Sequence, residues 1–94
     1  MFRSYAFGSL PYYVPVQLNK NIRVETDEKE IRLLGDGIGY RIDRNAMLMD
    51  ALALLKEGSC PIEIPEKVGA PKFMEEKLFQ LLNELYIRGY LRLK

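Results

Sequence analysis

The sequence predicts an α+β domain with a winged-helix-like fold, in which an N-terminal three-stranded antiparallel sheet is followed by a three-helix bundle. Apolar residues alternate with polar ones from residue 21 to residue 43, with the period of two that is typical of half-buried strands. From residue 45 onward they recur at helical spacing, with glycine or proline at the breaks. The chain of 94 residues is 48% hydrophobic, so we expect residues 1–94 to form a single domain around one core.

Residues 1–20 are expected to form an aromatic N-terminal arm. Pro11 and Pro15 disfavour a helix and pairing in the middle of a sheet, because proline lacks the backbone N–H that both require. The aromatic side chains have two candidate roles: they pack on the domain, or they dock on a partner, since aromatic residues are enriched at interfaces. These side chains belong to Phe2, Tyr5, Phe7, Tyr12 and Tyr13.

The predicted β-meander covers residues 21–43. Residues 26–29 are expected to form the loop between its first two strands. Asp36 and Gly37 lie between the second and third strands and fit a type I′ hairpin turn, whose two central residues need a positive φ. The inward-facing residues of the three strands would be Ile22 and Val24, then Ile31 and Leu33, then Ile38, Tyr40 and Ile42.

Residues 45–93 are expected to form a helix-turn-helix unit of three helices, the first of which has clear end signals. Asn45 is a suitable N-cap, because its side chain can accept a hydrogen bond from the first turn. Gly58 is a suitable C-terminal stop. The buried stripe of this helix would contain Leu48, Ala51, Leu52 and Leu55, widened by Met47, Met49 and Leu54 as core filler.

The second and third predicted helices are separated by a turn at residues 69–71. Pro65 suits the first turn of a short second helix that ends near Val68. The third helix would run from about residue 72 to residue 88, and Gly89 would end it in a left-handed conformation. Residues 90–93 then form an extended tail, which is too short to build a wing hairpin.

The composition argues against catalysis, a metal site or another cofactor. The chain has no histidine, which is the commonest general base and metal ligand. Its single cysteine, Cys60, has no partner for a disulfide or a metal cluster, so we expect a reducing, cytoplasmic location. No apolar run approaches the ~18 residues of a membrane span, so no membrane association is expected. The carboxylate pairs are expected to be solvated, and they are Glu28 with Glu30, Glu63 with Glu66, and Glu75 with Glu76.

A winged-helix DNA-binding regulator is the first alternative function, because helix-turn-helix units often bind DNA. The charge balance disfavours it, since 14 basic and 13 acidic residues leave a net charge of only +1. The start of the third helix, which would face the bases, carries Glu75 and Glu76. We therefore expect DNA to be a poor partner.

Peptide binding is favoured by the third strand, residues 38–43, as an edge of the meander. The unpaired backbone groups of an edge strand can accept an extended peptide as one more strand, and Gly39 lets another backbone approach closely. If the third helix lies beside this edge, the two form a groove in which Arg41, Lys77 and Arg88 would favour an acidic peptide. The alternatives are that the N-terminal arm covers the edge, or that a second copy covers it in a homodimer.

Three segments carry a resemblance to a known family: the meander ending in GYRID (residues 39–43), ALALLKEG (residues 51–58) and LFQLLNELYIRGYL (residues 78–91). With the order of three strands and three helices, residues 20–93 resemble the PqqD-like family, also called RiPP precursor peptide recognition elements (RREs). Members bind the leader of a ribosomally made precursor peptide as an added strand between the third strand and the third helix. They present it to a modifying enzyme, often a radical S-adenosylmethionine (SAM) enzyme, a cyclodehydratase or a lasso-peptide protease.

This resemblance implies a non-catalytic peptide chaperone in RiPP biosynthesis, with a leader peptide and a modifying enzyme as partners. The aromatic arm is not part of the family core. An accessory subunit of a separately encoded enzyme is the third functional hypothesis. By position, the implied peptide-binding residues are Ile38, Gly39, Tyr40, Arg41 and Ile42 on the strand, and Phe73, Lys77, Gln80, Leu81 and Glu84 on the helix.

Overall fold

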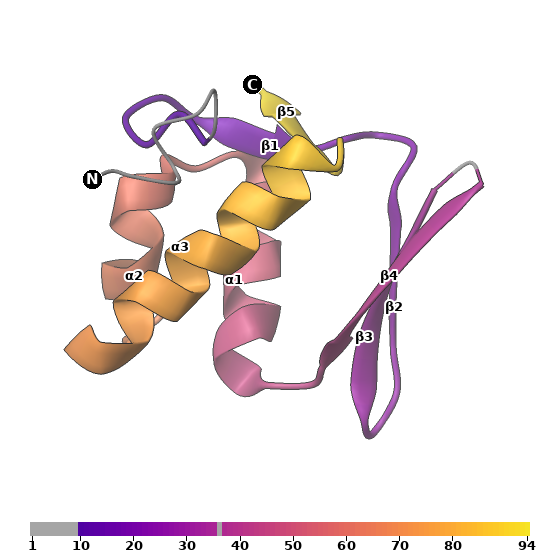
Figure 1. The fold of residues 1–94 in the computed structure, drawn as a ribbon, viewed down its shortest axis with the longest axis horizontal. Helices are drawn as coiled ribbons and strands as arrows, with labels where there is room; N and C mark the ends of the chain where they lie inside the picture. The colour runs from indigo at the N-terminus through magenta and orange to yellow at the C-terminus, as the bar shows by residue number, and fades with distance from the viewer. Residues whose placement is uncertain (1–9, 36) are drawn as a thin grey trace.

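The computed structural model describes residues 10–35 and 37–94 of the chain, which Figure 1 shows as a ribbon. The elements in chain order are β1 (Val16–Leu18), β2 (Arg23–Thr26), β3 (Glu30–Gly35), β4 (Ile38–Asp43), α1 (Ala46–Glu57), the 3₁₀ helix η2 (Pro61–Glu63), α2 (Ile64–Lys67), α3 (Lys72–Ile87) and β5 (Leu91–Leu93). Strands β2, β3 and β4 form a sheet beside the helices, whereas β1 and β5 form a separate pair. Within the described residues, the predicted three-stranded antiparallel sheet and three α-helices are confirmed.

The meander forms because one face of its central strand is buried. Strand β3 pairs antiparallel with both β2 and β4. Ile31 and Leu33 of β3 are 0% exposed, and their partners on β4 are Ile42 and Tyr40. Gly37 has a φ of 72°, as the predicted hairpin turn requires, while its neighbour Asp36 lies outside the described residues.

The second sheet joins segments from opposite ends of the described chain. Its antiparallel register pairs Val16 with Leu93 and Leu18 with Leu91. The sequence predicted an extended tail at residues 90–93 and an arm at residues 1–20, and it missed their pairing. Strands of three residues, separated by almost the whole chain, leave no periodic pattern long enough to detect.

Helix α1 begins and ends at the predicted residues. The Asn45 Oδ1 atom accepts a hydrogen bond from the Met47 N–H at 2.8 Å. Gly58, with a φ of 103°, donates its N–H to the Leu54 carbonyl at 2.9 Å. The buried residues of the helix are Ala51, Leu52 and Leu55.

The rest of the helical unit follows the predicted signals, with one addition. Pro61 starts the 3₁₀ helix η2 ahead of α2, which the sequence did not predict. Pro65 occupies the first turn of α2, as expected. Helix α3 ends at Ile87, with Arg88 as its C-cap, and Gly89 follows with a φ of 88°.

The described part of the arm packs on one flank of α3. Leu10 is 4% exposed and donates its N–H to Asn83 Oδ1 at 2.9 Å. The Tyr12 and Phe79 rings meet edge to face, with centroids 5.2 Å apart. Tyr13, in contrast, is 80% exposed. The expectations for Phe2, Tyr5 and Phe7 concern side chains outside the described residues.

Candidate functional site

Strand β4 is an edge of the three-stranded sheet, because the order is β2–β3–β4. Backbone groups along an antiparallel strand point alternately to its two neighbours. The Arg44 N–H donates to the Lys29 carbonyl at 2.9 Å, on the β3 side. By this alternation Tyr40 and Ile42 also bond to β3, and the N–H and C=O groups of residues 39, 41 and 43 point away from the sheet. No described strand pairs with this outer edge.

The inner face of β4 contributes to an apolar pocket under the helices. Ile42 lines it together with residues of α1 and α3, and its volume is only about 10 Å³, so it is a small packing void between buried side chains. The partners from α1 are Leu48, Ala51, Leu52 and Leu55, and those from α3 are Leu78, Leu81, Leu82 and Leu85. The structure therefore brings Ile42 and Leu81, one predicted residue from each side of the site, to the same pocket.

A second hollow, of about 170 Å³, adjoins the first between the start of α1 and the first half of α3. The two share Leu48, Leu78 and Leu81, and we call the open second hollow, with the small void beside Ile42, the β4–α3 groove. Lys77, which is exposed, contributes a positive charge to the rim of the groove. The remaining residues of the second hollow are Asn45, Met47 and Met74.

Tyr40 contacts residues that follow the C-terminal end of α3. Its ring centroid lies 5.9 Å from that of Tyr90, and the Arg88 guanidinium lies 5.3 Å from the Tyr40 centroid, in a cation–π contact. Arg88 Nε also donates to Glu84 Oε2 at 2.6 Å, and this bond raises the pKa of the arginine. The charge of Arg88 is therefore balanced within the helix, which reduces its value for binding an acidic peptide.

Some predicted site residues lie apart from the groove. Phe73 is 79% exposed at the start of α3, and neither Phe73 nor Gln80 lines either hollow. Gly39 is exposed on β4, where an added Cβ would lie 3.6 Å from Leu34 Cδ2, at ordinary contact distance. Arg41 is exposed. The side chain of Ile38 is outside what the structure describes.

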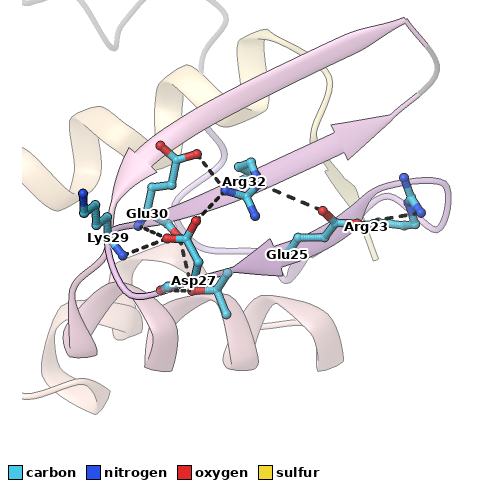
Figure 2. Close-up of polar contacts among 7 residues, drawn as sticks. Arg23, Glu25, Asp27, Lys29, Glu30 and Arg32 are labelled. Atoms are coloured by element: carbon cyan, nitrogen blue, oxygen red, sulfur yellow. Dashed lines mark hydrogen bonds and ion pairs between the residues drawn. The ribbon is translucent and has the colours of Figure 1, made fainter.

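The outer face of the sheet carries a cluster of charges around Arg32, which Figure 2 shows. Arg32 Nη1 lies 2.9 Å from Asp27 Oδ2 and 2.8 Å from Glu30 Oε2, and its Nε lies 4.0 Å from Glu25 Oε1. The hydrogen bonds to Asp27 and Glu30 raise the pKa of Arg32. The bond to Arg32, together with bonds from two backbone N–H groups, lowers the pKa of Asp27 to about 2. The cluster neutralises Arg32 and so stabilises the β2–β3 hairpin.

The described residues contain no group of three or more His, Cys, Asp or Glu side chains suited to hold a metal ion. Cys60 is half-buried, with its Sγ 3.7 Å from the Tyr13 carbonyl oxygen. Among the described helices, none is long and apolar enough to cross a membrane.

The comparisons with known proteins give no match. No protein-family model matches the chain, and neither the curated proteins nor the solved structures include a significant match.

Sequence reasoning missed several residues that shape the site. Met47 was expected to be core filler, yet it lines the groove beside Lys77, as does Met74. Their position in an otherwise leucine-rich stripe was the available signal, because methionine is common at adaptable binding surfaces. The contact between Tyr40 and Arg88 depends on tertiary structure, and no local pattern in the sequence indicates it.

Proposed function

We propose that the chain is a non-catalytic peptide chaperone that captures the leader of a ribosomally synthesised precursor peptide as an added strand on β4. It would present this leader to a modifying enzyme, such as a radical SAM enzyme or a cyclodehydratase, in the cytoplasm. The proposal takes the helical unit to be winged-helix-like and rests on the resemblance to RREs. The observation that carries it is the unpaired outer edge of β4 beside the β4–α3 groove.

The edge supplies affinity without requiring a particular peptide sequence. The outward N–H and C=O groups of Gly39, Arg41 and Asp43 can form a ladder with any extended backbone. Gly39 has no side chain on the outer face, and nothing described bonds to this edge in the chain itself. A peptide bound here therefore replaces water on backbone groups that are already in strand conformation.

The groove supplies side-chain selection. Alternate residues of an added strand point to the same face as Tyr40 and Ile42, that is, toward the helices. Apolar peptide side chains at this face would contact Leu48 and Leu81, the half-buried residues shared by the two hollows. Side chains on the opposite face would lie beside Arg41. A leader in which apolar residues alternate with polar ones, with an acid opposite Arg41, fits both faces.

The test is a fluorescence-anisotropy titration of the purified chain with the labelled leader of a precursor peptide encoded beside its gene. We expect saturable binding, which weakens when alternate amides of the peptide are N-methylated, because N-methylation removes the donors of the added strand. A matched pair of variants tests the protein side. Gly39→Pro removes an outward N–H and should weaken binding at least about fivefold, whereas Gly39→Ala keeps that N–H and should bind normally.

Other outcomes of the titration identify the alternatives. If the leader does not bind but a random DNA duplex does, and its affinity falls steeply with salt, the chain is a DNA-binding regulator. If neither ligand binds but an enzyme copurifies with the chain, it is an accessory subunit. Equal leader affinities for the proline and alanine variants would eliminate strand addition at this edge.

A further inference from the structure

The two charged residues on the outer face of β4 each lie opposite a residue of the same sign on β3. Arg41 is the register partner of Arg32, and Asp43 is the register partner of Glu30. Like charges that face each other directly across two strands destabilise a sheet. Arg32 and Glu30 balance each other, at 2.8 Å, and Arg32 also pairs with Asp27, at 2.9 Å. Among the described residues, Arg41 and Asp43 have no ion-pair partner.

A strand added to the outer edge of β4 could relieve both contacts if it offers an acid opposite Arg41 and a base opposite Asp43. The sequence of β4 itself has these two charges at the required spacing of two residues. We propose that β4 pairs antiparallel with β4 of a second copy of this chain, in a two-fold symmetric register centred on Ile42. In this register Arg41 of each copy faces Asp43 of the other.

The hydrogen-bonding pattern limits the possible registers. Only residues 39, 41 and 43 direct backbone groups outward, so a bonded pair must join an odd-numbered residue to an odd-numbered residue. Symmetric pairing must therefore be centred on a residue rather than between two residues. Around an Ile42 centre, both Arg41–Asp43 pairs exchange backbone hydrogen bonds in each direction.

The charges distinguish among four possible centres of symmetry, at residues 40, 41, 42 and 43. A centre at Arg41 places that arginine opposite its own copy, and a centre at Asp43 does the same for the aspartate. A centre at Tyr40 places Arg41 opposite Gly39 and leaves Asp43 without a strand partner. Only the Ile42 centre opposes unlike charges, which are favourable in directly facing positions.

The inner face at this centre is apolar. Directly facing residues that are not hydrogen-bonded to each other have the closest side chains in an antiparallel pair, and here both are Ile42. Each isoleucine already lines the apolar pocket under α1 and α3. Pairing would therefore place an apolar contact at the two-fold axis, flanked on the other face by the unlike charges.

The other edge of the same sheet, β2, carries unlike charges at the same spacing, Arg23 and Glu25, but these already have ion-pair contacts within the chain. On β2, Arg23 Nη1 lies 3.9 Å from Glu25 Oε2, and Glu25 Oε1 lies 4.0 Å from Arg32 Nε. The charges of β2 are thus paired within the chain, whereas those of β4 are not. This difference selects β4 as the self-pairing edge.

The test is sedimentation equilibrium of the purified chain at concentrations up to about 1 mM, where even a millimolar dissociation constant gives measurable dimer. Arg41→Asp places two acids face to face, and Asp43→Arg places two arginines face to face. Each variant alone should raise the dimer dissociation constant at least about tenfold. An equimolar mixture of the two variants restores unlike charges at both positions, so it should form a heterodimer close to wild-type affinity.

Controls separate this effect from general charge and from folding. Arg23→Asp on β2 and Glu28→Arg in the β2–β3 loop make the same charge changes away from β4 and should leave association unchanged. Circular dichroism should show all variants folded. A wild-type chain that stays monomeric throughout, or a dimer whose affinity the β4 variants do not alter, would overturn the proposal, as would failure of the mixture to associate.

Self-pairing is independent of the proposed peptide function, since it is measured with no peptide present. The leader peptide and the second copy of the chain would use the same edge, so a leader that binds β4 should dissociate the dimer. If the dimer forms and no leader binds, the self-pairing proposal stands and the chaperone proposal does not.

Discussion

Asp27 fixes the turn between β2 and β3 with a single carboxylate. Its Oδ1 accepts from the Lys29 N–H at 2.7 Å and from the Glu30 N–H at 2.9 Å, and its Oδ2 bonds to Arg32. All three bonds favour the ionised form, and the pKa of Asp27 falls from 3.8 to about 2. The turn that aligns the central strand is therefore sensitive to acid.

The free energy of unfolding should fall as the pH drops through this range. The folded-state pKa of Asp27 lies below its unfolded value of 3.8, so the unfolded chain binds more protons between pH 3.8 and about 2. The stabilisation is complete above pH 3.8 and is lost toward pH 2. Urea unfolding at a series of pH values should show this slope, and Asp27→Asn should reduce it. Glu28→Gln, in the same loop, is the control; an equal reduction by both variants would contradict the role of Asp27.

The charge of Lys77 at the rim of the groove should affect leader affinity if the proposed function is correct. Lys77→Glu should weaken binding of an acidic leader about fivefold, which corresponds to the scale of an exposed ion pair. Lys72→Glu is the matched control, because Lys72 is exposed on the same helix and does not line the groove. Anisotropy titrations that give the same dissociation constant for the two variants would remove Lys77 from the site.

At the scale of the elements, α1 depends on its cap because its first turn contains no acidic residue to interact with the helix dipole. Asn45→Ala removes the acceptor of the Met47 N–H, and should lower the free energy of unfolding by about 1 kcal/mol. Urea denaturation measures this change. Asn45→Ser retains a capping oxygen and should recover most of the lost free energy of unfolding. If the serine variant is destabilised as much as the alanine variant, the side-chain cap does not have this role.

Elements whose signals are local could be predicted from the sequence, and those that depend on distant segments could not. The alternation at Ile38, Tyr40 and Ile42 identified β4, and Asn45 and Gly58 identified the ends of α1. Nothing near Val16 indicates that it will pair with Leu93. The same distinction applies to the candidate site. Ile42 and Leu81 line the same void, whereas Phe73 and Gln80 line neither hollow, because register on a helix decides which side chain faces a groove.

For the whole molecule, the β1–β5 pair ties the core to the last residues of the chain. Tyr90 and Leu91 are 2% and 3% exposed, and each apolar side chain of this size contributes about 1.5–3 kcal/mol when buried. Because a small domain has only about 5–15 kcal/mol of total stability, deletion of residues 90–94 should abolish cooperative thermal unfolding as followed by circular dichroism. Leu93→Ala is the control: Leu93 is 54% exposed, and this variant should keep a cooperative transition.

The pairing of β1 with β5 also constrains how the protein folds during its own synthesis. β1 leaves the ribosome before the other described strands, but its partner is the last described element to emerge. Val16 and Leu18, which are 0% and 6% exposed in the folded chain, must remain without their strand partner until translation has passed residue 93. The hairpins and α1 can form earlier, because their contacts are local. Final closure is thus delayed, and a nascent chain stalled before residue 91 would expose an apolar strand that is prone to aggregation.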